Sequence, residues 1–227
     1  MNHRYFLKST KEQSHIQLKI GIVAFFFNLI ILAVAIVSGF YILFILSIVI
    51  TLSIIAPFFD VPTLKKNGRL IYYSSLFIAE KEKNGTIIVH GGSLFDYVFV
   101  IDKTLNGIQR TNFILQHYLE GLLNLIATCE KDHNTSVKIK GTTYILNERT
   151  ANKIGLKTTK TDFIQKLILT YNYVNVLVSN SIAKKKLSFP NMNNIKTFEC
   201  EINDLIERKE FIIALNNKLK NIATNSL

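Results

Sequence analysis

The longest apolar run in the chain extends from Ile20 to Phe59 and contains no charged residue. At about 1.5 Å per residue it would form roughly 60 Å of helix, twice the hydrocarbon core of a bilayer, which is about 30 Å thick. Gly39 divides the run, because glycine readily adopts the positive φ that a tight turn requires. The pattern predicts two transmembrane helices, at 20–37 and 41–58, and excludes an ordinary soluble protein.

Lys and Arg occur on both flanks of this hairpin. Residues 1–19 carry four basic residues against one acidic residue, and three more basic residues lie at 65–69. Positive flanks stay in the cytoplasm, so both ends are predicted to be cytoplasmic, with 1–19 as a basic tail. A cleaved signal peptide ending near Ala33-Val34-Ala35 is the alternative. Cleavage there would still leave 36–59 apolar and membrane-bound.

Two polar side chains in the hairpin stand at matching depth. Asn28 lies eight residues inside Ile20, and Thr51 lies eight residues inside Phe59. An amide in hydrocarbon needs a hydrogen-bond partner, so Asn28 and Thr51 are predicted to pair within one hairpin or across an oligomer. The pair would either fasten the helices together or line a pore.

Residues 60–227 contain both β-prone runs and segments with helical periodicity, and this mixture predicts one α+β domain. Residues 61–68 are expected to connect it to the second transmembrane helix, because Pro62 blocks continuation of that helix. The Asn84-Gly85 turn, and Gly91-Gly92 as a second turn, predict a three-stranded meander. Spacings of three and four predict a long helix from Thr111 to Cys129. The last helix, with Leu205, Ile212 and Leu219 at intervals of seven, packs on the sheet or pairs with a second copy. The expected strands are 70–79, 86–90, 94–101, 137–146, 173–178 and 197–201, and the other expected helices are 148–154 and 163–170.

The formal net charge of +11 is concentrated in one part of the domain. The stretch from His133 to Lys196 holds 11 basic residues and only two acidic ones, Glu148 and Asp162. Such a stretch attracts anionic lipids, nucleic acid or a phosphorylated small molecule, although a solvated lysine face gives the same pattern. Planar recognition of phosphate favours arginine. The predicted ligand-binding residues are Arg110, Arg149, Lys153, Lys184, Lys185 and Lys186.

Catalytic signals are weak. The run from Ile87 to Ser93 resembles the His-Gly-Gly oxyanion loop of lipases, but the Gly-x-Ser-x-Gly nucleophile motif is missing. Arg110 and His117 have the Arg-x6-His spacing that resembles HEPN ribonucleases, although Thr111 and the strand content depart from that family. Cys129, Glu130, Asp132 and His133 lack paired metal-ligand spacing. We therefore expect no catalytic residue, no metal and no cofactor, and a non-enzymatic protein.

A two-helix anchor followed by a small basic domain resembles the membrane effectors of bacterial antiphage systems that respond to cyclic nucleotides. The resemblance concerns architecture and involves no motif. It implies a homo-oligomer whose cytoplasmic domain binds an anionic ligand such as a cyclic oligonucleotide, with disturbance of the lipid bilayer as the output. Two alternatives remain open at this point. The first is a non-enzymatic subunit that binds other membrane proteins in an inner-membrane assembly for secretion, conjugation or polymer export, and the second is a membrane-tethered ribonuclease.

Overall fold

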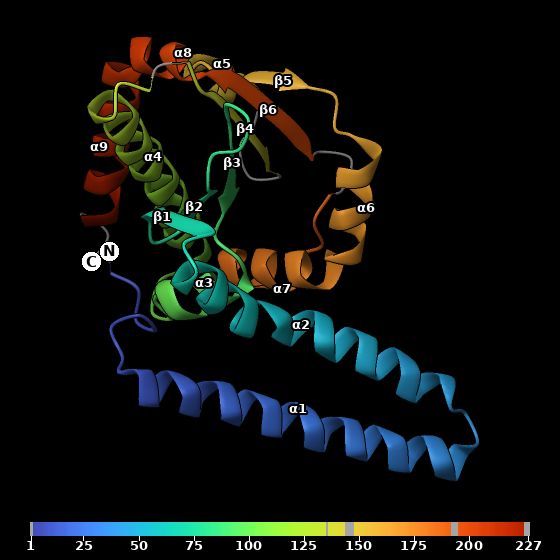
Figure 1. Ribbon diagram of the computed structural model, residues 1–227. Coiled ribbons are helices and arrows are strands. Elements are labelled where there is room, and N and C mark those ends of the chain that lie inside the picture. Colours follow the sequence, from blue (N-terminus) through green and yellow to red (C-terminus); the bar gives the residue numbers. More distant parts are fainter. Residues whose placement is uncertain (1, 135, 144–147, 192–194, 225–227) are drawn as a thin grey trace.

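Two long antiparallel helices, α1 (Thr10–Ser38) and α2 (Ile42–Lys66), form a hairpin that projects from a mixed α/β domain (Figure 1). The computed structural model describes residues 2–134, 136–143, 148–191 and 195–224. The predicted turn at Gly39 is confirmed, since this residue ends α1 in the left-handed conformation with φ 69°. Helix α1 begins ten residues earlier than predicted, because Ser9 and Glu12 form a capping box.

Both helices are long and apolar enough to cross a membrane. Only 6% of the most apolar 18-residue window of each helix is buried. A core helix of a soluble domain would be mostly buried, so the exposed apolar surface favours a lipid environment for the hairpin.

Helix α2 continues through Pro57 and Pro62, and the prediction of a connector starting at Pro62 is wrong. A proline has no N–H to donate to the carbonyl four residues earlier, so these two free the carbonyls of Ser53 and Phe58. A side-chain amide from another helix donates a hydrogen bond to each freed carbonyl. Asn175 Nδ2 donates to Ser53 O at 2.8 Å, and Gln17 Nε2 donates to Phe58 O at 3.0 Å. Neighbouring segments thus allow the helix to continue.

The polar contact inside the hairpin differs from the predicted pair. Ser47, and not Thr51, donates to Asn28 Oδ1 at 2.9 Å, while Asn28 Nδ2 donates to Ala24 O. Asn28 lies eleven residues after Gln17, and Ser47 lies eleven residues before Phe58, so both interhelical contacts share one antiparallel register. The predicted pairing of Asn28 with Thr51 would require a different register. In the structure, the partner of Asn28 is Ser47, which lies about one helical turn before Thr51.

The domain contains a six-stranded sheet in the order β1-β2-β3-β4-β6-β5. Strands β3 and β4 are parallel, and the other neighbours are antiparallel. A three-stranded meander is present, but its strands differ from the predicted ones: the run 70–79 supplies its first two strands, and Thr86–Gly91 supplies the third. The strands are β1 (Leu70–Ser74), β2 (Phe77–Glu80), β3 (Thr86–Gly91), β4 (Lys138–Thr143), β5 (Lys157–Thr159) and β6 (Lys196–Glu201).

Two segments predicted as strands are helices. Residues 94–100 form α3, because Ser93 and Asp96 make a capping box. Since a helix and not a strand follows Gly92, the predicted hairpin turn at Gly91-Gly92 is wrong. Residues 173–178 open a longer helix, and a short apolar run does not by itself separate strand from helix. The helices of the domain are α3 (Leu94–Val100), α4 (Gly107–Lys131), α5 (Glu148–Lys153), α6 (Phe163–Tyr171), α7 (Tyr173–Lys184), α8 (Ile202–Glu207) and α9 (Lys209–Thr224).

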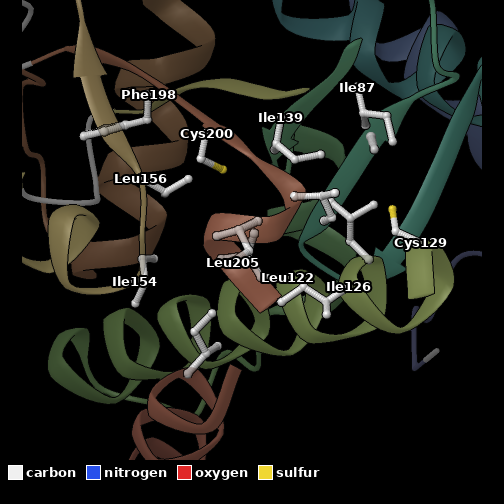
Figure 2. Packing of buried hydrophobic residues seen from close by; sticks show 14 of the residues in the cluster. Ile87, Leu122, Ile126, Cys129, Ile139, Ile154, Leu156, Phe198, Cys200 and Leu205 are labelled. Carbon is white, nitrogen blue, oxygen red and sulfur yellow. The ribbon is translucent and has the colours of Figure 1, made fainter. Parts of the chain in front are cut away.

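The main core lies between the sheet and α4. Leu122 and Ile126 of α4, Ile139 of β4 and Leu205 of α8 belong to one apolar cluster (Figure 2). Ile212 of α9 is fully buried in the same cluster, so the final helical segment packs within its own chain. The interruption between α8 and α9 is the only departure from the predicted last helix among the described residues.

The amino-terminal segment is packed into the domain although it was expected to form a tail. His3 and Tyr5 are buried against α3, and Arg4 donates to the carbonyls of Val98, Phe99 and Ile101. Asp96, itself fully buried, binds His3 Nε2 at 3.1 Å and the Tyr72 hydroxyl at 2.6 Å, in addition to capping α3. These contacts place the chain before α1 and the domain after α2 at the same end of the hairpin.

Candidate functional site

The six predicted ligand-binding residues fall into two separate groups. Arg110 lies near the end of α7, but its guanidinium is already used: it donates to the carbonyls of Leu105, Lys103 and Ile182 at 2.7–3.0 Å. Arg110 is also 8% exposed. Its role in the structure is to join α4 to α7, and a ligand phosphate would have to displace these bonds.

The remaining five predicted residues are exposed. Lys184, Lys185 and Lys186 follow one another at the end of α7, where Lys185 takes the left-handed conformation with φ 53°. Arg149 and Lys153 lie on α5, which packs against β5. Figure 1 shows α5 and the end of α7 on opposite sides of the domain, so the structure does not bring the two groups together.

Carboxylates from the end of the chain neutralise part of the basic stretch. Glu199 of β6 lies 3.7 Å from Lys138 Nζ and 2.9 Å from Lys140 Nζ, and Asp204 of α8 lies 3.3 Å from Lys157 Nζ. Both carboxylates come after Lys196 in the sequence. Counting charge along the chain therefore overstated the positive charge that is free to meet a ligand.

A polar cavity remains between the β5 edge of the sheet and α6. Its volume is about 580 Å³, within the range typical of small-molecule sites. Lys160 and Lys166 contribute ammonium groups for which the described residues provide no ion pair. We call it the lysine–threonine cavity, and it is lined by Thr158, Thr159, Lys160, Thr161, Lys166, Leu169, Thr170, Ile195 and Lys196.

The third lysine of this cavity is paired. Lys196 donates to Glu148 at the start of α5. This hydrogen bond lowers the pKa of Glu148, so the carboxylate stays ionised at neutral pH. The lysine–threonine cavity thus combines one neutralised pair with two free positive charges, which suits an anion better than a cation.

Hydroxyl groups line the strand side of the same cavity. Thr197 of β6 donates to Thr161 at 3.2 Å, and its hydroxyl lies 3.1 Å from the Thr142 hydroxyl. Thr159 donates to Thr197 O at 3.5 Å. Hydroxyls and ammonium groups are the donors that bind phosphate oxygens. Two of the lining threonines already donate their hydroxyl protons, Thr159 to Thr197 O and Thr170 to Lys166 O. The ammonium groups of Lys160 and Lys166 are therefore the main donors with which the cavity can hold a phosphate-bearing molecule without arginine.

A second cavity, of about 210 Å³, lies between the sheet and helices α4 and α9. Its lining is almost wholly apolar and includes Phe77, Leu122, Phe198 and Leu215. It belongs to the main core and offers an anion no charged partner apart from His90 at its edge.

The Arg110 and His117 pair does not form an exposed catalytic site. His117 Nδ1 lies 3.3 Å from Glu120 Oε2, and its ring packs against Phe113. Burial lowers the pKa of His117 although Glu120 opposes the shift. With Arg110 held by carbonyls, the two residues expected from the ribonuclease resemblance are both engaged in packing.

Metal binding receives no support from the described part of the chain, where no group of three or more His, Cys, Asp or Glu residues could hold an ion. Cys129 and Cys200 are separate, buried free cysteines. Burial raises the pKa of Cys200 to about 12, so its thiol is neutral and unreactive.

Sequence reasoning counted Lys160, Lys166 and Lys196 in the basic stretch but did not select them. The available signal was the segment 157–161, which consists only of lysine and threonine. Only the pairing of β5 with β6 places these hydroxyls and ammonium groups on one side of α6.

Comparison with known proteins found no matching family model, no matching curated protein and no matching solved structure.

Proposed function

We propose that this chain is a membrane-anchored receptor for a phosphate-bearing ligand, with α1 and α2 crossing the bilayer and the lysine–threonine cavity binding the ligand. The observation that carries the proposal is the position of Lys160 and Lys166, without an ion pair among the described residues, in the cavity between β5 and α6. Helix α6 leads through Asn172 into α7, which is hydrogen-bonded to α2. Ligand binding and the hairpin are thus linked by two consecutive helices.

The proposed orientation has both termini in the cytoplasm at the bacterial inner membrane. The basic flanks of the hairpin support this orientation. The contacts of His3 and Arg4 with α3 add support, because they require the amino-terminal segment and the domain to share one side of the membrane.

A cyclic oligonucleotide is the ligand that the architectural resemblance to antiphage effectors suggests. In that case, the output would be a change in oligomeric state and a disturbance of the bilayer by the hairpin. A lipid head group presents the same phosphate chemistry, and the test must separate the two.

The test measures thermal unfolding of the full chain in mild detergent with cyclic dinucleotides, cyclic oligonucleotides, inorganic phosphate or glycerol phosphate. A ligand present at 100 times its Kd stabilises the folded state by about 2.7 kcal/mol. We expect one nucleotide to raise the unfolding temperature more than glycerol phosphate does. Equal effects of glycerol phosphate and every nucleotide would identify the site as a head-group site.

The double variant Lys160→Gln/Lys166→Gln should abolish the stabilisation. Lys218→Gln, on the exposed side of α9, is the matched control and should leave it unchanged. If Lys184→Gln/Lys185→Gln/Lys186→Gln removed the stabilisation instead, the ligand would belong to the end of α7. If none of these anions stabilised the chain, receptor function would be rejected, and stable copurification with other membrane proteins would favour the assembly subunit.

A further inference from the structure

Helix α6 turns its apolar side chains outward. Five large apolar side chains are spaced alternately one and three residues apart, so they lie along one face of the helix: Phe163, Ile164, Leu167, Ile168 and Tyr171. None of its nine residues is buried. The exposed fractions are 75% for Phe163, 62% for Ile164, 59% for Leu167, 48% for Ile168 and 68% for Tyr171.

The opposite face of α6 is turned toward the domain across the lysine–threonine cavity. Lys166, Leu169 and Thr170 line the lysine–threonine cavity. The apolar face therefore points away from the cavity and from the sheet. A contiguous exposed apolar face of this kind is typical of a surface that contacts a protein or a membrane.

The position of α7 places α6 along the hairpin. Asn175, four residues after Tyr171, donates to Ser53 O at 2.8 Å and to Ser53 Oγ at 3.4 Å. At the base of the hairpin, Gln17 of α1 binds Phe58 O of α2. Ser53 is five residues closer to the hairpin tip than Phe58, which is a distance of about 8 Å along the axis of α2 at 1.5 Å per residue. Figure 1 shows α6 on the side of the domain toward which the hairpin tip projects.

We infer that α6 is an interfacial membrane helix whose apolar face enters the lipid surface beside the hairpin. This inference rests on the proposed insertion of α1 and α2. Interfacial amphipathic helices lie about 5–10 Å into the boundary between head groups and acyl chains, which agrees with the displacement of Ser53 from the base.

Neighbouring side chains fit a lipid partner. Tyr171 and Phe163 stand at the two ends of the helix, and aromatic rings favour the membrane interface. The exposed apolar residues of α1 and α2, such as Ile30 and Leu52, extend the same lipid-facing surface beyond Ser53.

The chain has no tryptophan, so single tryptophans report on single positions. The full chain is reconstituted into vesicles of phosphatidylethanolamine and phosphatidylglycerol whose acyl chains carry bromine either near the head group or near the chain end. Phe163→Trp and Ile164→Trp are two reporters on the apolar face of α6. Ile30→Trp reports insertion of α1, and Phe211→Trp, 42% exposed on α9, is the control on the far helix.

Tryptophan at 163 or 164 should emit at shorter wavelength in vesicles and lose most of its emission to bromine near the head group. Tryptophan at 30 should be quenched most by bromine near the chain end, and tryptophan at 211 by neither. Quenching at 30 without quenching at 163 and 164 would overturn the interfacial helix while leaving the anchor intact.

Two other outcomes would also overturn the inference. Absence of quenching at 30 would remove the membrane insertion on which it rests. Short-wavelength emission at 163 that disappears when the protein is diluted in the vesicles would assign the apolar face to a second copy of the chain.

Discussion

In α4 the apolar stripe faces the sheet, and Leu125 and Ile126 are fully buried. In α6 the corresponding stripe faces outward, and Leu167 is 59% exposed. Both helices have the periodicity of an amphipathic helix. The comparison shows that periodicity predicts a helix and its apolar face, whereas the surroundings decide which solvent that face meets.

Helix α7 sharpens the contrast, because it buries polar side chains. Asn175 binds the carbonyl of Ser53, and Asn180 binds the carbonyl and hydroxyl of Ser188. Ser179 is also buried. Helix α7 thus combines buried hydrogen bonds with a second apolar cluster, in which Ala183 packs with Tyr97 and Ile114, while α6 leaves its apolar residues exposed.

The largest expected effect is that of Leu125→Ala in α4. Removal of a fully buried leucine side chain costs about 2–5 kcal/mol, because the cavity it leaves is only partly filled by relaxation. Urea unfolding of the full chain in mild detergent measures the change in the free energy of unfolding. A loss below about 0.5 kcal/mol, the range of ordinary surface substitutions, would show that α4 does not carry the core.

An intermediate effect is expected for Asn175→Ala. Loss of its amide leaves the Ser53 carbonyl without a donor, which costs about 1–3 kcal/mol when the group is buried. The same substitution is also made in a Pro57→Ala variant. There the backbone N–H of residue 57, which proline lacks, can donate to Ser53 O. The Asn175→Ala loss should be smaller in that background, as a double-mutant cycle measures. Equal losses in both backgrounds would contradict the role assigned to Pro57.

The smallest expected effect is that of Leu167→Ala in α6. Its side chain is mostly exposed, so the free energy of unfolding in the same detergent should change by no more than about 0.5 kcal/mol. The identical substitution at Leu125 serves as the control. A loss at Leu167 as large as at Leu125 would mean that α6 packs into the domain and that the contrast is false.

Much of the fold was accessible from local patterns. The hairpin turn at Gly39, the long helix around Leu122 and the Asn84-Gly85 turn each depend on neighbours in sequence. The errors at α3 and α7 arose in short apolar runs, where strand and helix periodicities are not distinguishable. The Ser93 capping box was a local signal that would have corrected the first of them.

The candidate site was less accessible. Its lysines were recognised only as part of a long basic stretch, and Arg110 was favoured for its chemistry although it is bound to carbonyls. Pairing of Glu199 and Asp204 with lysines far away in sequence could not be read from charge spacing.

By itself, the sequence determined the apolar hairpin, the helical periodicities and the excess of positive charge, because composition and local spacing set these properties. Only the tertiary structure decided which lysines remain free, which donors take the carbonyls freed by Pro57 and Pro62, and that α6 turns its apolar face outward. Each of these depends on residues brought together from distant parts of the chain.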